Sequence, residues 1–274
     1  MSDPAAVACL TIIGIILLAG ILAPILPLSD PETVNVADKL LTPDAYHWLG
    51  TDALGRDIFS RLIWGIRTTV FTAIVAMLLT CTIGAIYGSF AALLGGRTES
   101  LMMRFADIVM SFPSAVLILA IVGMAGPGLL NILFACVIAK WPWYARMMRS
   151  IIRSLMTSGY VQFARVCGAS YRQIFFGHLL PGVAGEYFVL MTIDTGAVIL
   201  MISSLSFLGL GVQPPTPEWG MMLSEAKNVL SLYPWQMLPA GCAVLLVVAV
   251  FNFLGDSLRD AFDVKHMVRS GGVQ

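Results

Sequence analysis

Long runs of apolar residues alternate with short polar stretches along this chain. About 20 apolar residues, rising 1.5 Å each in a helix, cross the hydrocarbon core of a bilayer. Runs of about this length predict an all-α, polytopic membrane protein with about six transmembrane helices, forming a single domain over residues 1–274. The expected spans are residues 5–28, 68–94, 105–124, 129–145, 181–210 and 237–254.

The first span is predicted to be a retained helix rather than a cleaved signal peptide. It is too long for a signal-peptide core, no Lys or Arg precedes it, and it ends at Pro27 and Asp30-Pro31 without a small-residue cleavage site. The only charged residue before this span is Asp3, and the polar segment that precedes the span is short.

Composition agrees with a membrane protein and excludes several other classes. The chain is 58% hydrophobic and 12% charged, with a mean hydropathy of +0.86, whereas soluble domains are about 25% charged. Its formal net charge is zero, which disfavours nucleic acid as a partner. The five cysteines are scattered and the three histidines lie far apart, so we expect packing roles and no preformed metal site.

The orientation follows from the distribution of Lys and Arg among the loops. With a cytoplasmic N-terminus, eleven of these residues fall in cytoplasmic segments and five in external ones, which favours both termini inside. The external ones are Lys39, Arg56, Arg61, Arg67 and Lys227. The cytoplasmic ones are Arg97, Arg104, Lys140, Arg146, Arg149, Arg153, Arg165, Arg172, Arg259, Lys265 and Arg269.

Two polar stretches are long enough to have structure of their own. Residues 29–67 are expected outside and residues 146–180 inside. Within the inner stretch, small and basic residues recur at helical spacing before a turn at residues 168–170, and a second helical stretch follows at 171–179. This predicts a helix-turn-helix at the cytoplasmic face that another protein grips. A solvated loop is the alternative.

Motifs for catalysis are missing from the sequence. It contains no G-x-x-x-x-G-K-[ST] phosphate loop, no H-E-x-x-H and no assembled nucleophile-and-base pair. We therefore expect no enzyme activity. A transporter driven by ATP must obtain its motor from another chain, and one driven by an ion gradient must carry acidic residues in its spans.

Three acidic residues lie within the predicted spans, where an ionisable group is costly and usually faces a partner or a cavity. Asp107 has Arg104 three residues earlier, which favours a local ion pair. Glu186 lies one turn inside its helix and can reach the interface. Asp194 lies mid-span, with Met191 and Met201 in the same helix. It either bonds a neighbouring helix or lines a translocation path.

Two spans also contain helix breakers. Pro113 interrupts the third span, and small residues crowd the outer end of the fifth at positions 203–211. Both features allow hinge motion or close static packing.

Four separated motifs resemble the permease subunits of the dipeptide/oligopeptide/nickel class of ABC importers, and the likeness covers nearly the whole chain. They are LGTDALGRDIFSRL (49–62), YVQFARVCGAS (160–170) with a proline at 181, SFLGLGVQPPTPEWG (206–220) and GDSLRD (255–260). The motif at 160–170 is similar to the coupling motif of that family. It departs from the usual pattern at Gln162 and Phe163, where an acidic residue and an alanine are usual, which puts a salt bridge from position 162 in doubt.

The resemblance implies a type I ABC importer permease fold in a bacterial inner membrane. Its partners would be a second related permease, two ATPase subunits and an external binding protein. This chain would hold no cofactor, because the ATPases would bind ATP and magnesium. The implied coupling residues are Tyr160, Gln162, Ala164, Arg165, Gly168, Ala169 and Arg172.

Details within the family favour the nickel or metal-chelate branch. Residues 141–150 resemble that branch, and so does Asp194, where peptide permeases usually have a small neutral residue. An acid facing the path favours a cation, with Asp194, Glu186, Met191 and Met201 as candidate path residues and no tight metal cage.

Other functions remain open at this stage. The first alternative is dipeptide or oligopeptide import by the same architecture. The second is a proton-coupled secondary transporter using Asp194 and Glu186, against which the absence of a detectable inverted repeat counts. A membrane enzyme lacks the residues it needs.

Overall fold

The computed structural model describes residues 4–270, with side chains up to residue 262. The described chain is helical and forms no β-strand, which confirms the all-α prediction. The α-helices are α1 (Pro4–Leu22), α2 (Ile58–Ile66), α3 (Thr72–Leu94), α4 (Gly96–Met110), α5 (Ser114–Ala125), α6 (Leu129–Met156), α7 (Gly159–Val166), α8 (Tyr171–Ile174), α9 (Leu180–Phe207), α10 (Trp219–Lys227) and α11 (Leu238–Ser270).

Four shorter turns complete the helical elements. Two are 3₁₀ turns, Val36–Asp38 and Pro234–Met237. The other two are π-helical turns that continue into the long helices, Arg67–Phe71 between α2 and α3, and Phe175–Leu179 between α8 and α9.

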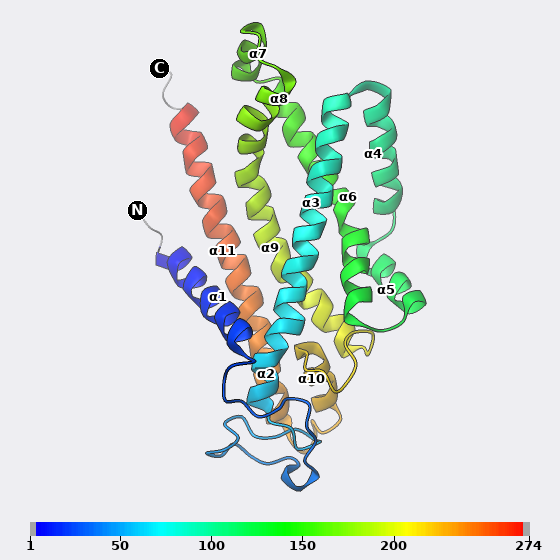
Figure 1. Ribbon diagram of the computed structural model, residues 1–274, viewed down its shortest axis with the longest axis vertical. Coiled ribbons are helices and arrows are strands. Elements are labelled where there is room, and N and C mark those ends of the chain that lie inside the picture. Colours follow the sequence, from blue (N-terminus) through cyan, green and yellow to red (C-terminus); the bar gives the residue numbers. More distant parts are fainter. Residues whose placement is uncertain (1–3, 271–274) are drawn as a thin grey trace.

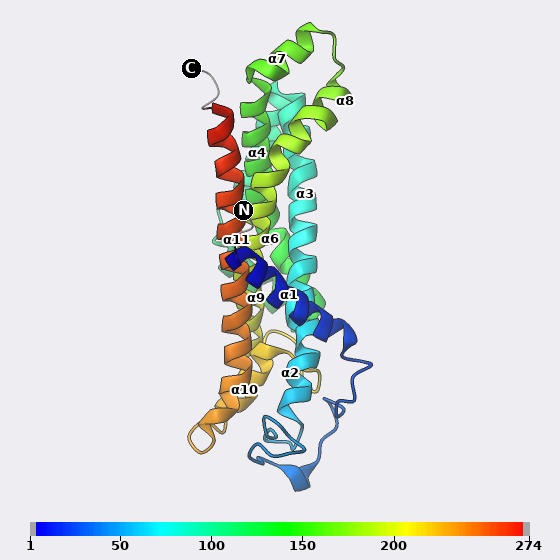
Figure 2. The same ribbon diagram turned by 90° about the vertical axis from the view of Figure 1, so that its left-hand side faces the viewer.

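The long helices form an elongated bundle (Figure 1). Helices α3, α6, α9 and α11 run along its long axis, and α1 lies obliquely beside α2 and α11 (Figure 2). Helices α7 and α8 project at one end of the bundle, whereas α10 and the loops of residues 29–57 lie at the opposite end. The last turns of α11 point towards the α7–α8 end (Figure 1).

Four helical stretches of the described chain are long and apolar enough to cross a membrane: Pro4–Leu22, Ile58–Leu94, Tyr171–Phe207 and Pro234–Phe262. Helices α4 and α5 pass the same test only as a bent pair. Helix α6 has 28 residues and lies within the bundle, but it is more polar. Among the described residues four stretches, or five with the bent pair, thus pass this test, against about six predicted spans.

Several helix ends differ from the predicted ones. Helix α1 ends at Leu22 rather than 28, because Pro24 and Pro27 supply no N–H donors for further turns. The second span begins at Ile58, inside the stretch predicted to be an external loop. Its start is fixed by Asp57, whose carboxylate accepts from the Ser60 amide.

The chain between α5 and α9 is also more helical than expected. Helix α6 continues to Met156, so the first part of the predicted cytoplasmic loop 146–180 is helical. Its arginines pair with acidic residues of α4, which allows a charged helix end to pack against a neighbour. Glu99, 7% exposed, lies 2.5 Å from Arg149 and also pairs with Arg153.

The predicted third span is divided at Pro113, which confirms the breaker. Helices α4 and α5 meet there at 76°. A residue before proline is driven away from helical geometry, and Ser111 and Phe112 form the corner.

Two glycines bring α3 and α6 into close contact. A Cβ atom at Gly84 would lie 2.5 Å from the Cβ of Tyr144, and one at Gly88 would lie 2.2 Å from the carbonyl oxygen of Ala145. Small residues four apart on one helix face allow such backbone approach in membranes. This contact sets the separation of the two helices.

We expect Gly88→Leu to destabilise the chain by about 3 kcal/mol, because the added side chain meets backbone rather than a movable side-chain end. Thermal unfolding of the detergent-purified chain measures the effect. Gly123→Leu is the matched control, since a Cβ there meets nothing within 4 Å. An equal loss in both variants would contradict the close contact.

Candidate functional site

A polar cluster lies in the middle of the bundle, where α9 faces α6. The Asp194 carboxylate accepts a 2.8 Å hydrogen bond from the Tyr144 hydroxyl. The Lys140 ammonium lies 3.4 Å from the same oxygen, Oδ2. Tyr144 is fully buried, whereas the side chains of Asp194 and Lys140 are 31% and 16% exposed. An acid, an amine and a hydroxyl thus share one site that is partly open.

The neighbouring hydroxyl groups of α9 donate to backbone carbonyl oxygens and not to Asp194, whose hydrogen-bond partners lie on α6. Thr192 and Thr195 donate to carbonyl oxygens of their own helix, 2.9 and 2.7 Å away. The Tyr187 hydroxyl donates to the Cys81 carbonyl oxygen at 2.7 Å and so ties α9 to α3. Asp194 therefore bonds a neighbouring helix, which was one of the two roles predicted for it; the other was to line a translocation path.

Two charged residues make pairings that the sequence did not predict. Lys140 was counted with the cytoplasmic charges although it falls within the predicted span 129–145, and the structure places it inside α6, paired with Asp194. Asp107 pairs with Arg146 on α6 rather than with Arg104, so that prediction is wrong. Because α4 and α6 lie side by side, the facing helix offers the partner.

The other candidate path residues follow the same helix. Met191 and Met201 are three residues before and seven after Asp194, spacings that place all three on one face of α9. Both methionines are partly buried against the main core. Glu186 is exposed and lies about 12 Å along the helix from Asp194. The structure therefore does not bring the two acids together.

Helices α7 and α8 form the expected helix-turn-helix at the end of the bundle (Figure 1). The turn passes through Gly168 at φ +85°, with open space around its α-carbon. Ser170 and Gln173 form a reciprocal capping box at the start of α8. The spacing of small residues in the sequence thus predicted this element correctly.

The surface of this helix-turn-helix is unusually apolar. Phe163 and Val166 are 68% and 85% exposed, and Tyr160 and Tyr171 are 50% and 74% exposed. Single exposed apolar residues are ordinary, whereas four on one short element make it a candidate interaction site.

Each predicted coupling residue has a definite place on this element. Gln162 turns back to the Thr157 carbonyl oxygen at 3.1 Å. Ala164 and Ala169 are half-buried, and Arg172 is exposed. The Arg165 guanidinium lies 5.9 Å from the centre of the Tyr171 ring.

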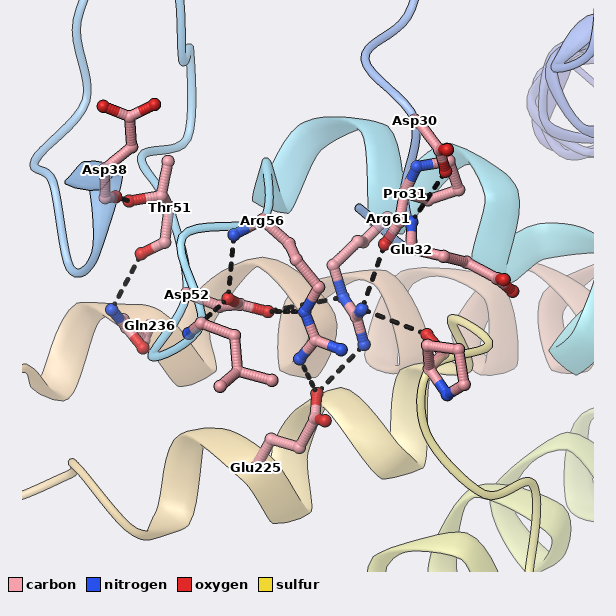
Figure 3. A network of polar contacts seen from close by, with 12 residues as sticks. Asp30, Pro31, Glu32, Asp38, Thr51, Asp52, Arg56, Arg61, Glu225 and Gln236 are labelled. Carbon is pink, nitrogen blue, oxygen red and sulfur yellow. Dashed lines mark hydrogen bonds and ion pairs between the residues drawn. The ribbon is translucent and has the colours of Figure 1, made fainter. Parts of the chain in front are cut away.

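A second polar network, which sequence reasoning missed, joins the loop before α2 to α10 (Figure 3). These elements lie at the end of the bundle opposite α7 and α8 (Figure 1). Arg56 and Arg61 are 2% and 1% exposed. Their guanidinium groups converge on one oxygen of Glu225, Oε2, at 2.8 and 2.9 Å. Asp52 pairs with the Arg56 Nε at 2.7 Å. Two buried cations are therefore balanced by two carboxylates from the loop and from α10.

The same network joins the two external motifs that the sequence singled out. Arg61 also donates to the Pro215 carbonyl oxygen at 3.3 Å. The Trp219 indole N–H donates to the Leu62 carbonyl oxygen at 2.9 Å. Residues 49–62 and 206–220 thus form a single packed unit.

Glu218 is fully buried within this unit. Its carboxylate accepts from the Thr69 hydroxyl at 3.0 Å and from the Met221 amide at 2.8 Å. Burial raises the pKa of Glu218, and these hydrogen bonds act in the opposite direction. The carboxylate caps α10 and fixes it against the α2–α3 helix.

Metal-ligating residues are dispersed. No group of three or more His, Cys, Asp or Glu side chains that could hold a metal ion occurs among residues 4–262. His47 pairs with Asp57 at 3.0 Å, and the ring of His178 lies edge-on to Tyr160. The side chain of His266 lies outside the described residues.

These features define a helical membrane protein, with a polar cluster in the bundle and an exposed helix-turn-helix at one end. The chain belongs to the family of binding-protein-dependent transport system inner membrane components, whose model matches residues 84–266. It is therefore a multi-pass inner membrane protein.

Three relatives illustrate the breadth of the family. The chain is 43% identical to the nickel transport system permease protein NikC of Escherichia coli K12, over 87% of this chain and 86% of that one. It is 37% identical to the metal-staphylopine import system permease protein CntC of Staphylococcus aureus, over 96% and 91%. It is 36% identical to the probable D,D-dipeptide transport system permease protein DdpC of Escherichia coli K12, over 99% and 90%.

Solved structures show the same fold. The chain matches the inward-facing MetNI methionine ABC transporter with a TM-score of 0.54 and 16% sequence identity, over 73% of this chain and 97% of that one. This is the type I ABC importer permease fold that the motifs implied.

Proposed function

We propose that this chain is one half of the translocation pathway of an ATP-driven importer for nickel or a nickel chelate. The similarity to a nickel permease and to a metal-staphylopine permease supports this cargo. The observation that carries the proposal is that one chain has both a partly open acidic site in the bundle and an exposed apolar helix-turn-helix at its end.

The helix-turn-helix α7–α8 is the contact for the motor. The sequence of the whole chain contains no phosphate loop, so ATP and magnesium would bind to separate ATPase subunits. The exposed side chains of Tyr160 and Phe163 supply apolar contact. Arg165 and Arg172 supply positive charge for acidic residues of the ATPase. Closure of two ATPases would then rock the bundle through this rigid element.

The orientation and the other partners of the proposal follow from this assignment. The α7–α8 end faces the cytoplasm of a bacterial cell, and both termini lie on that side. The opposite end, with the arginine network, faces the external binding protein. A second, related permease lines the other half of the path, opposite the α9 face that carries Asp194, Met191 and Met201, and Glu186 lies at the inner end of that face.

Dipeptide import by the same architecture is the second candidate, because the chain is also 36% identical to a dipeptide permease over 99% of its length. A proton-coupled secondary transporter is disfavoured, since Asp194 already pairs with Lys140 and Tyr144.

Uptake of labelled nickel, supplied alone or with histidine as chelator, tests the cargo in cells with and without this chain. We expect deletion to abolish nickel uptake, and excess di- and tripeptides to leave it unchanged. Uptake that peptides inhibit, or nickel uptake independent of this chain, would assign the chain to the peptide branch.

A further inference from the structure

The polar cluster on α6 and α9 is unusual because it presents both signs of charge. Asp194 and Lys140 come from different helices and meet at 3.4 Å. An acid on its own at membrane depth would attract a bare cation. Here Lys140 supplies a cation beside Asp194. The pair is therefore neutral overall, with a positive side and a negative side.

The pair is only half enclosed by this chain. One oxygen of Asp194, Oδ2, receives both the Tyr144 hydroxyl and the Lys140 ammonium. The Asp194 side chain remains 31% exposed, although its helix lies within a membrane span. Charged groups in spans avoid lipid and face a water-filled path or another chain. The open side of the pair therefore faces the interior of the assembly.

We infer that Asp194 and Lys140 together form a recognition site for a cargo carrying a carboxylate beside a cationic centre. Such a cargo offers its carboxylate to Lys140 and its metal ion or ammonium to Asp194. A bare divalent cation matches only one half of the pair and is repelled by the other. An amino-acid chelate of a metal matches both halves.

This inference rests on the proposed function and narrows its cargo. A zwitterionic dipeptide carries the same two groups and is therefore a second class of cargo that this pair would recognise. The fully buried Tyr144 is a positioning residue here, since its hydroxyl holds the Asp194 carboxylate towards Lys140.

The test uses the whole transporter in proteoliposomes with its binding protein and ATP. The probes are nickel alone, nickel with histidine, and a glycyl dipeptide. In Lys140→Gln we expect uptake of the nickel–histidine chelate to fall about ten-fold or more, the effect of losing one charged hydrogen bond. We expect Lys140→Arg to recover most of it. Lys227→Gln, at an exposed position of α10, is the matched control.

A double variant separates recognition from folding. Asp194→Asn with Lys140→Gln leaves no unpaired charge, so a purely structural ion pair predicts normal assembly and normal uptake. The recognition site predicts normal assembly, retained ATP hydrolysis stimulated by the binding protein, and loss of chelate or dipeptide uptake.

The outcomes are distinguishable. Wild-type uptake of every transported probe by the double variant would overturn the recognition site while leaving the importer intact. Faster uptake of nickel alone in Lys140→Gln, with the chelate unaffected, would also overturn it. If the wild-type complex transports none of the three probes, the proposed function fails, and the inference fails with it.

Discussion

Replacing Glu225 by glutamine is expected to lower the stability of the chain by about 3 kcal/mol, the low end of the range for breaking a buried ion pair. Glutamine keeps the shape but removes the charge that balances both Arg56 and Arg61, whose side chains are 2% and 1% exposed. We take the low end because Glu225 itself is 20% exposed. Loss of this charge leaves Asp52 as the carboxylate paired with Arg56 and Arg61.

The thermal unfolding of the detergent-purified chain gives the measurement. Glu186→Gln is the matched control, because that carboxylate is exposed and outside this network. A shift in the Glu225 variant no larger than in the control would show that the network contributes nothing measurable. Arg61→Gln should also destabilise the chain, since Glu225 and Asp52 both lie beside Arg61.

Gly168→Trp is the second change with a large expected effect, and it acts on coupling rather than on folding. A Cβ atom at position 168 meets nothing within 4 Å in the isolated chain. In the proposed complex the indole would lie in the contact between α7–α8 and the ATPase. We expect ATP-driven uptake to fall about ten-fold or more, equivalent to at least 1.4 kcal/mol of lost contact.

The backbone at Gly168 has φ +85°, which any residue with a Cβ adopts at some cost. Gly168→Asn controls for that cost, because asparagine tolerates this region and adds little bulk. Co-purification of the ATPases and uptake are measured together in both variants. Normal uptake in Gly168→Trp would remove α7–α8 from the motor contact.

The sequence predicted the elements that depend on local patterns. Hydropathy gave the apolar spans, and the spacing of small residues gave α7 and α8, because a helix periodicity is contained in a few consecutive residues. The break at Pro113 was predictable for the same reason.

Pairings between distant residues were not predictable in this way. Glu225 lies more than 160 residues from the arginines that it neutralises, and no local pattern relates them. Lys140 was counted with the cytoplasmic charges although it falls within the predicted span 129–145, and no local pattern places Asp194, 54 residues later, opposite it. The start of α2 did have a local signal in Asp57, since an acid before an apolar run indicates the start of a helix.

The corner between α4 and α5 has a consequence for the newly made chain. Helix α4 has 15 residues and α5 has 12, about 22 and 18 Å in length, and neither alone crosses a hydrocarbon core of about 30 Å. The corner at Ser111, Phe112 and Pro113 is exposed on the surface of this chain. Non-helical backbone at that depth is tolerated only where protein or water covers it. A newly made copy without the partner permease proposed above would therefore leave this corner uncovered.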